Sequence, residues 1–390
     1  MLQPKRVNLE NAPPSFKPHS FKSKTTITSR IRSSPYDPAG RRRIRTARSS
    51  KYATEQAKRK NKHKTPPTPV QFQVTSVSTA PQIVDVQMGD VDQQPVLTTQ
   101  THRLPRELLR PEFLNISKET LVSVEPDLGD DDLDIEYIRE RVEEFGPGLL
   151  RTVISVVANP PKDSLPAEIT ISVNDSEYPP PTHMLAVHGR SSKDGPAAAR
   201  RQVTLIPSHS LVLALHCARL PKLAPTPTPH YADDDPTQLI IPVQPLCLPS
   251  PAAFPLLSTF LYTMRADQLL KALLPAPPPP ELDGDRALLP VFAARLARTY
   301  TAQALLGHVN SVHGLWQNAC ALGVFVDELW DTIDLAWEVL LTAMAISAGT
   351  PQVMLRRPSS PSPPAAPASE ESTAASSSST SDPPASAPTP

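Results

Sequence analysis

The chain has 390 residues, and 49 of them are prolines, so a length that allows two or three domains is expected to form one substantial core. Its 39 basic and 39 acidic residues balance only as a total: residues 1–64 carry eighteen Lys and Arg against three acids. Three distant cysteines exclude a disulfide framework. The most apolar stretch, 315–348, contains five acids, so we expect no membrane span and no membrane partner.

Residues 1–103 predict a disordered basic N-terminal arm. They are rich in Lys, Arg, Pro, Ser and Thr and show no sustained hydrophobic period, so burial cannot offset the entropy of the chain. Alternating apolar residues within 70–86 leave open a short strand or a docking peptide.

Two basic clusters stand out in this arm. They consist of Arg41, Arg42, Arg43 and Arg45 and, after twelve residues, of Lys58, Arg59, Lys60, Lys62 and Lys64. Two cationic groups at this spacing are typical of a bipartite nuclear localisation signal that occupies separate acidic grooves of an import receptor. The clusters therefore predict a nuclear import receptor as a partner and location in the nucleus. Contact with nucleic acid through counterion release stays possible.

Residues 104–285 predict an α/β interaction domain. Residues 104–122 could form a helical turn or two, broken by Pro111. The first full helix is expected over 131–145, with Leu133 and Tyr137 on the apolar face and Gly146-Pro147-Gly148 as the end. Leu133 and Tyr137 are weak candidates for partner binding, although ordinary packing on a core is favoured. The elements that follow are predicted as strands over 149–157, 168–173, 183–187, 202–206 and 239–248 and as helices over 211–220, 252–262 and 267–274. His216 and Cys217 are interpreted as packing residues of the helix 211–220.

Residues 286–349 predict a helical extension packed on this domain, and 350–390 predict a disordered Pro/Ala/Ser tail. The last helix places Trp330 and Trp337 at helical spacing on one face, which makes them weak candidates for partner binding. The predicted fold class is therefore α+β, with a helical C-terminal extension and disordered termini.

No recognisable catalytic motif is present. The sequence has no Gly-x-Ser-x-Gly turn, no glycine-rich phosphate loop, no His-Glu-x-x-His and no regular zinc-ligand spacing. We therefore expect a non-enzyme without a cofactor or a metal site.

Residues 202–274 are similar to the BTB/POZ pattern. The phrase Leu205-Ile206-Pro207-Ser208-His209-Ser210 leads into an apolar helix, and a later strand precedes a segment that ends in Leu261-Tyr262-Thr263. The resemblance implies a mixed α/β fold used for dimers and adaptor contacts. The interrupting loop is proline-rich, and the acidic residue usual at the dimer interface is not identifiable, which puts homodimerisation in doubt.

A wider region, 110–350, resembles the clampless proteins of mushroom-forming and smut fungi. The resemblance rests on the phrase from His209 to Pro221, on 248–263 and on the helical end with Trp316, Trp330 and Trp337. It implies a regulator that acts downstream of mating-type homeodomain factors in clamp-cell formation and dikaryon growth, and it has no catalytic residues to carry over.

Three functions follow as hypotheses. The first is a non-enzymatic nuclear regulator of fungal sexual development that contacts regulatory proteins such as transcription factors. The second is a nucleic-acid-binding transcription factor that uses the basic arm. The third is a BTB-type adaptor for ubiquitin ligation.

Overall fold

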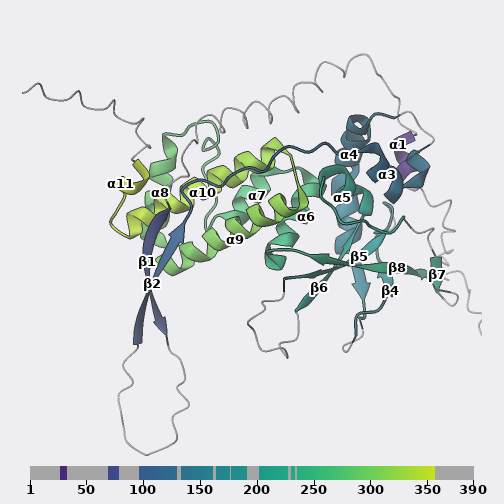
Figure 1. The fold of residues 1–390 in the computed structure, drawn as a ribbon, viewed down its shortest axis with the longest axis horizontal. Coiled ribbons are helices and arrows are strands. Elements are labelled where there is room, and N and C mark those ends of the chain that lie inside the picture. The colour runs from purple at the N-terminus through teal and green to yellow at the C-terminus, as the bar shows by residue number, and fades with distance from the viewer. Residues whose placement is uncertain are drawn as a thin grey trace, which may run out of the picture.

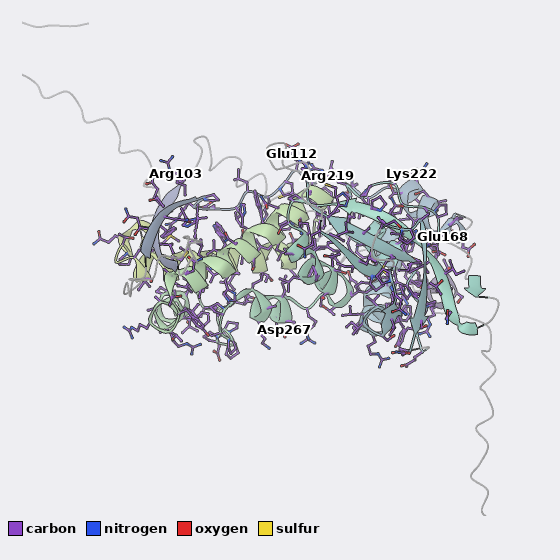
Figure 2. All side chains as sticks on the ribbon, turned by 90° about the horizontal axis from the view of Figure 1, so that it is seen from below. Arg103, Glu112, Glu168, Arg219, Lys222 and Asp267 are labelled. Carbon is purple, nitrogen blue, oxygen red and sulfur yellow. The ribbon has the colours of Figure 1, made fainter. Side chains whose placement is uncertain are left out.

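The fold, a computed structural model, combines a strand-rich half and a helical half side by side (Figure 1). It describes residues 27–32, 69–78, 96–129, 133–160, 164–175, 177–190, 202–226, 230–232 and 235–355. The predicted α+β class is confirmed for this part of the chain. Figure 2 shows an elongated molecule, with Arg103 toward one end and Glu168 toward the other.

The strand-rich half contains a six-stranded sheet. Its strands are β3 (Val156–Ala158), β4 (Glu168–Val173), β5 (His183–His188), β6 (Val203–Ser208), β7 (His230–Ala232) and β8 (Asp235–Cys247). The order is β3-β4-β8-β5-β6, with β7 also paired to β8. The first part of β8 runs antiparallel to β4 and its last part runs parallel to β5, so this one long strand joins both sides of the sheet.

Helices accompany this sheet and continue into the second half. The first group is α1 (Ile27–Arg32), α3 (Lys118–Val124), the 3-10 turn η1 (Pro126–Leu128), α4 (Ile135–Ile154) and α5 (Ser210–His216). The second group is η2 (Pro251–Ala253), α6 (Phe254–Thr263), α7 (Ala266–Leu273), α8 (Leu288–Thr299), α9 (Ala302–Leu322), α10 (Asp327–Ser347) and α11 (Gln352–Leu355). The predicted helical extension thus contains the three helices α8–α10, and α10 ends just before Gly349. The short helix α11 lies within 350–390, which the sequence predicts as a disordered tail.

The first predicted helix is longer than expected, because α4 continues through Gly146-Pro147-Gly148 to Ile154. A Cβ at Gly146 would lie 1.9 Å from the backbone oxygen of Tyr262, and one at Gly148 would lie 2.3 Å from the Tyr178 ring. The glycines therefore permit a close approach of α4 to its neighbours rather than a helix end. This packing outweighs the loss of one backbone hydrogen bond at Pro147.

The strand predicted over 149–157 is consequently wrong for most of its length. Leu149, Thr152 and Val153 are buried on the last turns of α4, and only Val156–Ala158 pairs as a strand, at the edge of the sheet. The other strands and helices predicted between 168 and 274 are present within a few residues of their expected bounds.

Order also begins earlier than the predicted boundary at 104. The strands β1 (Val70–Ser78) and β2 (Val96–Leu104) form an antiparallel pair, and Val70, Phe72 and Val74 are buried on the helical half beside α9. The first part of that alternation, 70–78, therefore belongs to a strand, and 79–86 lie outside the described residues. Three alternating apolar side chains suffice to hold this strand in place, because a helical surface is available to bury them.

A single large hydrophobic core runs through both halves. It includes Val212 and Leu215 of α5, Phe254 of α6 and Trp330 of α10. A smaller hydrophobic cluster is formed by strand residues of the sheet and includes Ile171, Met184 and Ile241. The halves are therefore packed as one body.

Candidate protein-interaction site

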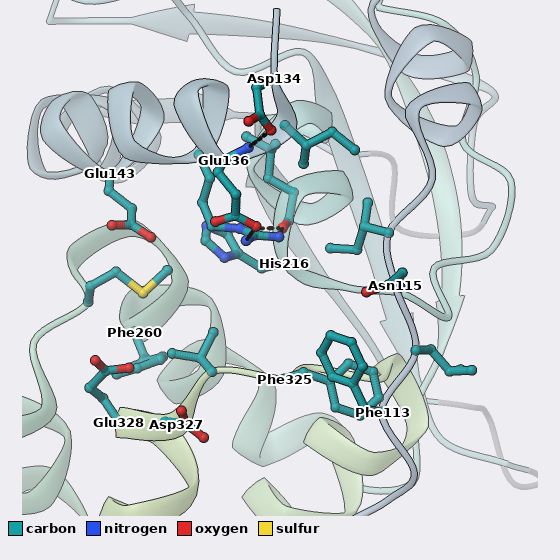
Figure 3. A pocket seen from close by; sticks show the side chains of 17 residues that line it. Phe113, Asn115, Asp134, Glu136, Glu143, His216, Phe260, Phe325, Asp327 and Glu328 are labelled. Atoms are coloured by element: carbon teal, nitrogen blue, oxygen red, sulfur yellow. Dashed lines mark hydrogen bonds and ion pairs between the residues drawn. The ribbon is translucent and has the colours of Figure 1, made fainter. Parts of the chain in front are cut away.

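A cavity of about 640 Å³ lies where the two halves meet. Its walls come from the segment before α3, the start of α4, the end of α5, the end of α6 and the start of α10 (Figure 3). The residues that line it are Phe113, Leu114, Asn115, Ile116, Asp134, Ile135, Glu136, Arg139, Glu143, Leu215, His216, Phe260, Met264, Phe325, Val326, Asp327 and Glu328. Because its walls come from five distant parts of the chain, it exists only in the folded protein.

One wall is an extended strap, residues 105–116, which crosses the helical half. Trp337 donates its indole N–H to the carbonyl of Pro105 at 3.2 Å, and Trp316 donates to that of Leu109 at 2.8 Å. Arg110 is almost buried and bonds the carboxylates of Asp331 and Asp334 on α10 at 2.7 and 2.8 Å. These contacts hold the strap in place at the mouth of the cavity.

The remaining apolar wall is aromatic and sulfur-containing. Phe113 of the strap packs edge-on against Phe325, with ring centroids 5.2 Å apart. Phe260 and Met264 come from the end of α6. Met264 takes the left-handed conformation, with φ of +50°, and donates its N–H to the carbonyl of Phe260 at 2.7 Å. A residue other than glycine in this region is strained, and such strain often lies at functional sites.

The rim of the cavity is acidic. Five carboxylates line it against a single guanidinium, and these residues are Asp134, Glu136, Glu143, Asp327, Glu328 and Arg139. Figure 3 shows Glu143 and Glu328 on one side of the opening and the Phe113–Phe325 pair on the other. The cavity therefore places carboxylates beside an apolar surface.

Arg139 is already engaged by its neighbours. It bonds Glu136 at 2.5 Å and donates from two nitrogens to the carbonyl of Leu215, at 3.2 and 3.1 Å. That carbonyl lies in the last turn of α5, where the helix leaves oxygens without an intrahelical partner. Arg139 thus anchors α5 to α4.

His216 forms part of the inner wall. The side chain is 2% exposed, and neither ring nitrogen has a hydrogen-bond partner among the described residues. Burial, helped by the positive charge of Arg139, lowers the pKa of His216 to about 3. The ring is therefore neutral at neutral pH and carries one donor and one acceptor.

A second buried histidine supports the site from behind. The His209 ring is likewise neutral at neutral pH, because burial lowers its pKa to about 4. The Tyr262 hydroxyl accepts the backbone N–H of His209 at 2.8 Å and lies 3.0 Å from its Nδ1, while Nε2 lies 3.0 Å from the Pro179 carbonyl. This network fixes α5 against α6, which carry His216 and Phe260.

No group of three or more potential metal ligands occurs in the part of the chain that the structure describes. Cys217, next to His216, is fully buried, and burial raises the pKa of its thiol to about 12, far from a reactive thiolate. Among the described helices, none is long and apolar enough to cross a membrane.

The candidate residues from the sequence have mixed positions. The two basic clusters, 41–45 and 58–64, lie outside the described residues. Trp330, Trp337 and Tyr137 are buried, and their polar atoms bond the carbonyls of Val324, Pro105 and Ile31. A partner cannot reach these three side chains without opening the core. Leu133 is half-buried against it.

Sequence reasoning missed the cavity. The sequence predicts His216 as a packing residue, and its burial agrees, but no local pattern shows that both ring nitrogens lack hydrogen-bond partners among the described residues. The acids of the rim come from two segments almost 200 residues apart, 134–143 and 327–328. Only the tertiary structure brings them together.

Two family descriptions match the chain. The first, clampless protein 1 N-terminal domain, matches residues 111–249. The second, clampless protein 1 C-terminal domain, matches residues 267–378. No curated protein and no solved structure matches. The end of the strap (111–116), the sheet and α4–α5 thus lie in the first match, and α8–α10 lie in the second.

Proposed function

Because the chain belongs to the clampless protein 1 family, whose two domains together match 251 of its 390 residues, we propose that it is a non-enzymatic regulator of clamp-cell formation and dikaryon growth that acts through protein contacts. The single observation that carries the contact mechanism is the cavity at the junction of the two domains. It combines an apolar wall with carboxylates, and side chains that anchor a protein partner commonly fill such pockets.

The proposal is tested by complementation in a clamp-forming fungus that lacks its own copy. The full chain should restore clamp cells, and a variant with a closed cavity, Asn115→Trp, should restore fewer while it accumulates to the same level. Glu168→Gln, an exposed change on β4 away from the cavity, serves as the control and should complement fully. Equal complementation by all three proteins would argue against the cavity as the working surface.

Nuclear location is part of the proposal and rests on the two basic clusters. A fluorescent full chain should accumulate in nuclei, and Gln substitution at the nine Lys and Arg residues of the clusters should abolish this accumulation. If that variant also loses salt-dependent affinity for DNA, the transcription-factor alternative is favoured, because phosphate contacts weaken steeply with salt.

A BTB/POZ-like centre is the second candidate, and one arrangement favours it. The strand β6 leads through His209 into α5, and Tyr262 from the later Leu-Tyr-Thr phrase bonds His209. The two phrases that carry the resemblance thus contact each other. An adaptor role predicts that the full chain retrieves a cullin-type scaffold in a pull-down, and repeated failure to retrieve one would exclude that role.

A further inference from the structure

The short helix α1 docks on the strand-rich half from a distant part of the chain. It contacts α4, and the groups that hold it come from α3, α4 and the segment before β5 (Figure 1). Residues 27–32 belong to the arm predicted as disordered and lie outside both family matches, whereas the groups that hold them lie within 111–249. A six-residue helix does not persist alone in water, so α1 owes its shape to docking.

Two isoleucines anchor α1 in apolar surroundings. Ile27 and Ile31 are four residues apart, so their side chains lie on one face of the helix, and both are buried. They belong to the large core, which here includes Leu121 of α3 and Tyr137 and Ile138 of α4. Apolar anchors at this spacing are typical of a short helix that occupies a groove in another protein surface.

Hydrogen bonds near both ends of α1 fix its position. The Thr28 hydroxyl donates to the Glu125 carboxylate at 3.2 Å, and the Tyr137 hydroxyl donates to the Ile31 carbonyl at 3.2 Å. That carbonyl lies in the last turn of the helix, where oxygens have no intrahelical partner. Glu125 is 8% exposed, so departure of Thr28 would remove one of the bonds to a buried carboxylate.

The guanidinium of α1 also has a defined place. Arg30 donates to the Glu177 carbonyl at 2.5 Å, and its guanidinium lies 4.6 Å from the centre of the Tyr178 ring, a distance at which the ring attracts a cation. Arg151 approaches the same ring at 5.5 Å, but its charge is paired with Asp175 and Glu177. The surface therefore offers a matching group to each buried or polar contact of α1.

We propose that this surface is a docking groove for a short amphipathic helix and that α1 is its ligand, a reversible latch that fastens the arm to the first family domain. The occupant is the chain's own residues 27–32. Its few contacts must offset the entropy of ordering the segment, so α1 opens without the rest of the fold. Docking of α1 is independent of clamp-cell formation and of nuclear import, so its failure would leave the proposed function untouched.

The first experiment separates the ligand from its groove in the full chain. Ile31→Asp should release α1, because a carboxylate cannot be buried in this apolar contact, while the groove stays intact. The probe is a fluorescein-labelled peptide of residues 20–34, and the control peptide exchanges the residues at 27 and 29. The exchange keeps charge and composition but removes the spacing of four.

Fluorescence anisotropy should show that the Ile31→Asp chain binds the probe at least about tenfold more tightly than it binds the control peptide. The natural sequence should bind the probe at least about tenfold more weakly than the variant does, because its tethered α1 competes. Thr28→Asp, which places a second carboxylate beside Glu125, releases α1 by another route and should bind the probe as well. Absence of binding to both variants, or equal binding of both peptides, would overturn the proposal.

A substitution in the groove locates the bound probe. In the Ile31→Asp chain, Tyr137→Phe removes the donor to the helix carbonyl and should weaken the probe about threefold or more. The matched control is Tyr300→Phe, which removes a hydroxyl that donates to the Pro275 carbonyl, and it should change affinity less than about twofold. Equal effects of the two substitutions would place the probe elsewhere and overturn the proposal.

Hydrogen exchange measures whether the latch opens in the natural sequence. Amides of 27–32 should exchange more slowly than in Ile31→Asp and faster than the buried amides of α10. Protection equal to that of α10 would make α1 a permanent part of the fold, and protection equal to that of the variant would mean that α1 is not docked. Either result overturns the proposal.

Light scattering tests whether α1 docks within one chain. The natural sequence and Ile31→Asp should both be monomers. A dimer that Ile31→Asp converts into a monomer would assign α1 to the groove of a second copy and overturn the latch.

Discussion

Buried polar residues show how single side chains organise this molecule. His183 and His209 lie in the core and have partners on both ring nitrogens, from Thr182 and the Ala224 carbonyl for the first and from Tyr262 and the Pro179 carbonyl for the second. His216 lies equally deep, and its ring nitrogens have no hydrogen-bond partner in the part of the chain that the structure describes. The first two histidines therefore join elements of the fold, and the third faces the cavity.

Removal of one hydroxyl tests the first role. Tyr262→Phe should lower the free energy of unfolding by about 1–3 kcal/mol, because the backbone N–H of His209 and its Nδ1 lose their shared partner inside the core. Urea denaturation measures this change. The matched control is Tyr300→Phe. The half-buried Tyr300 hydroxyl donates to the Pro275 carbonyl at 2.6 Å, and its removal should lower the free energy of unfolding by less. A larger loss in the control would contradict this reading.

The buried histidines also predict a dependence of stability on pH. Their folded pKa values, about 4 for His209 and about 3 for His216, lie below the ordinary 6.5. The unfolded chain therefore binds these protons first, and the stability present above pH 6.5 is lost as pH falls toward 4 and 3. Each histidine contributes a slope of up to about 1.4 kcal/mol per pH unit.

The measurement is the urea midpoint between pH 7 and pH 5 for the natural sequence and for His216→Leu. The variant should show the shallower decline, since it lacks the proton that His216 takes up on unfolding. Glu125, whose pKa is raised by burial, titrates in both proteins and cancels in the comparison. Identical slopes would show that His216 takes up no extra proton on unfolding.

Element packing in this fold depends on glycines that face other segments, among them Gly146 and Gly314. Gly146 of α4 has no room for a Cβ beside the Tyr262 backbone oxygen. Gly314 of α9 lies close to Ser250, where a Cβ would be 2.4 Å from Oγ. Beside it, Asn318 bonds both the N–H and the carbonyl of Ser250, at 3.0 and 2.7 Å. Close approach, rather than backbone freedom, explains these glycines.

A pair of glycine substitutions separates packing from helix propensity. Gly146→Ala should destabilise the protein by about 1–3 kcal/mol, because the clash is with backbone and neither helix can yield locally. Gly307→Ala, in the exposed middle of α9 with nothing within 4 Å, should stabilise it by about 0.5–1 kcal/mol. Thermal melts of both variants give the signs, and stabilisation by Gly146→Ala would refute the close approach.

The two family domains share one hydrophobic core in the whole molecule. The N–H groups of Ala218 and Arg219, just after α5, donate to the carbonyls of Gly323 and Leu322 at 3.0 and 2.8 Å. Cys217 and Val324 form a bridge beside them. The strap adds Arg110, which reaches from the first domain's edge to Asp331 and Asp334. Backbone pairing and burial thus cross the junction directly.

This shared core predicts cooperative unfolding. The full chain should unfold in a single calorimetric transition whose calorimetric and van't Hoff enthalpies agree. Separate pieces 111–249 and 267–355 should expose core apolar surface and aggregate or bind hydrophobic dyes. Two resolved transitions in the full chain would mean that the domains fold independently.

The sequence by itself determined the α+β class, most strands and helices after 168, and the similarity to one family, because these depend on local periodicity and on recognisable phrases. Only the tertiary structure decided the course of α4 through Gly146-Pro147-Gly148, the strap, and the cavity with His216 and its acidic rim. Local preferences amount to about 1 kcal/mol per residue or less, apart from proline, so contacts between distant segments override them. A cavity depends on such contacts alone, so no local pattern in the sequence predicts it.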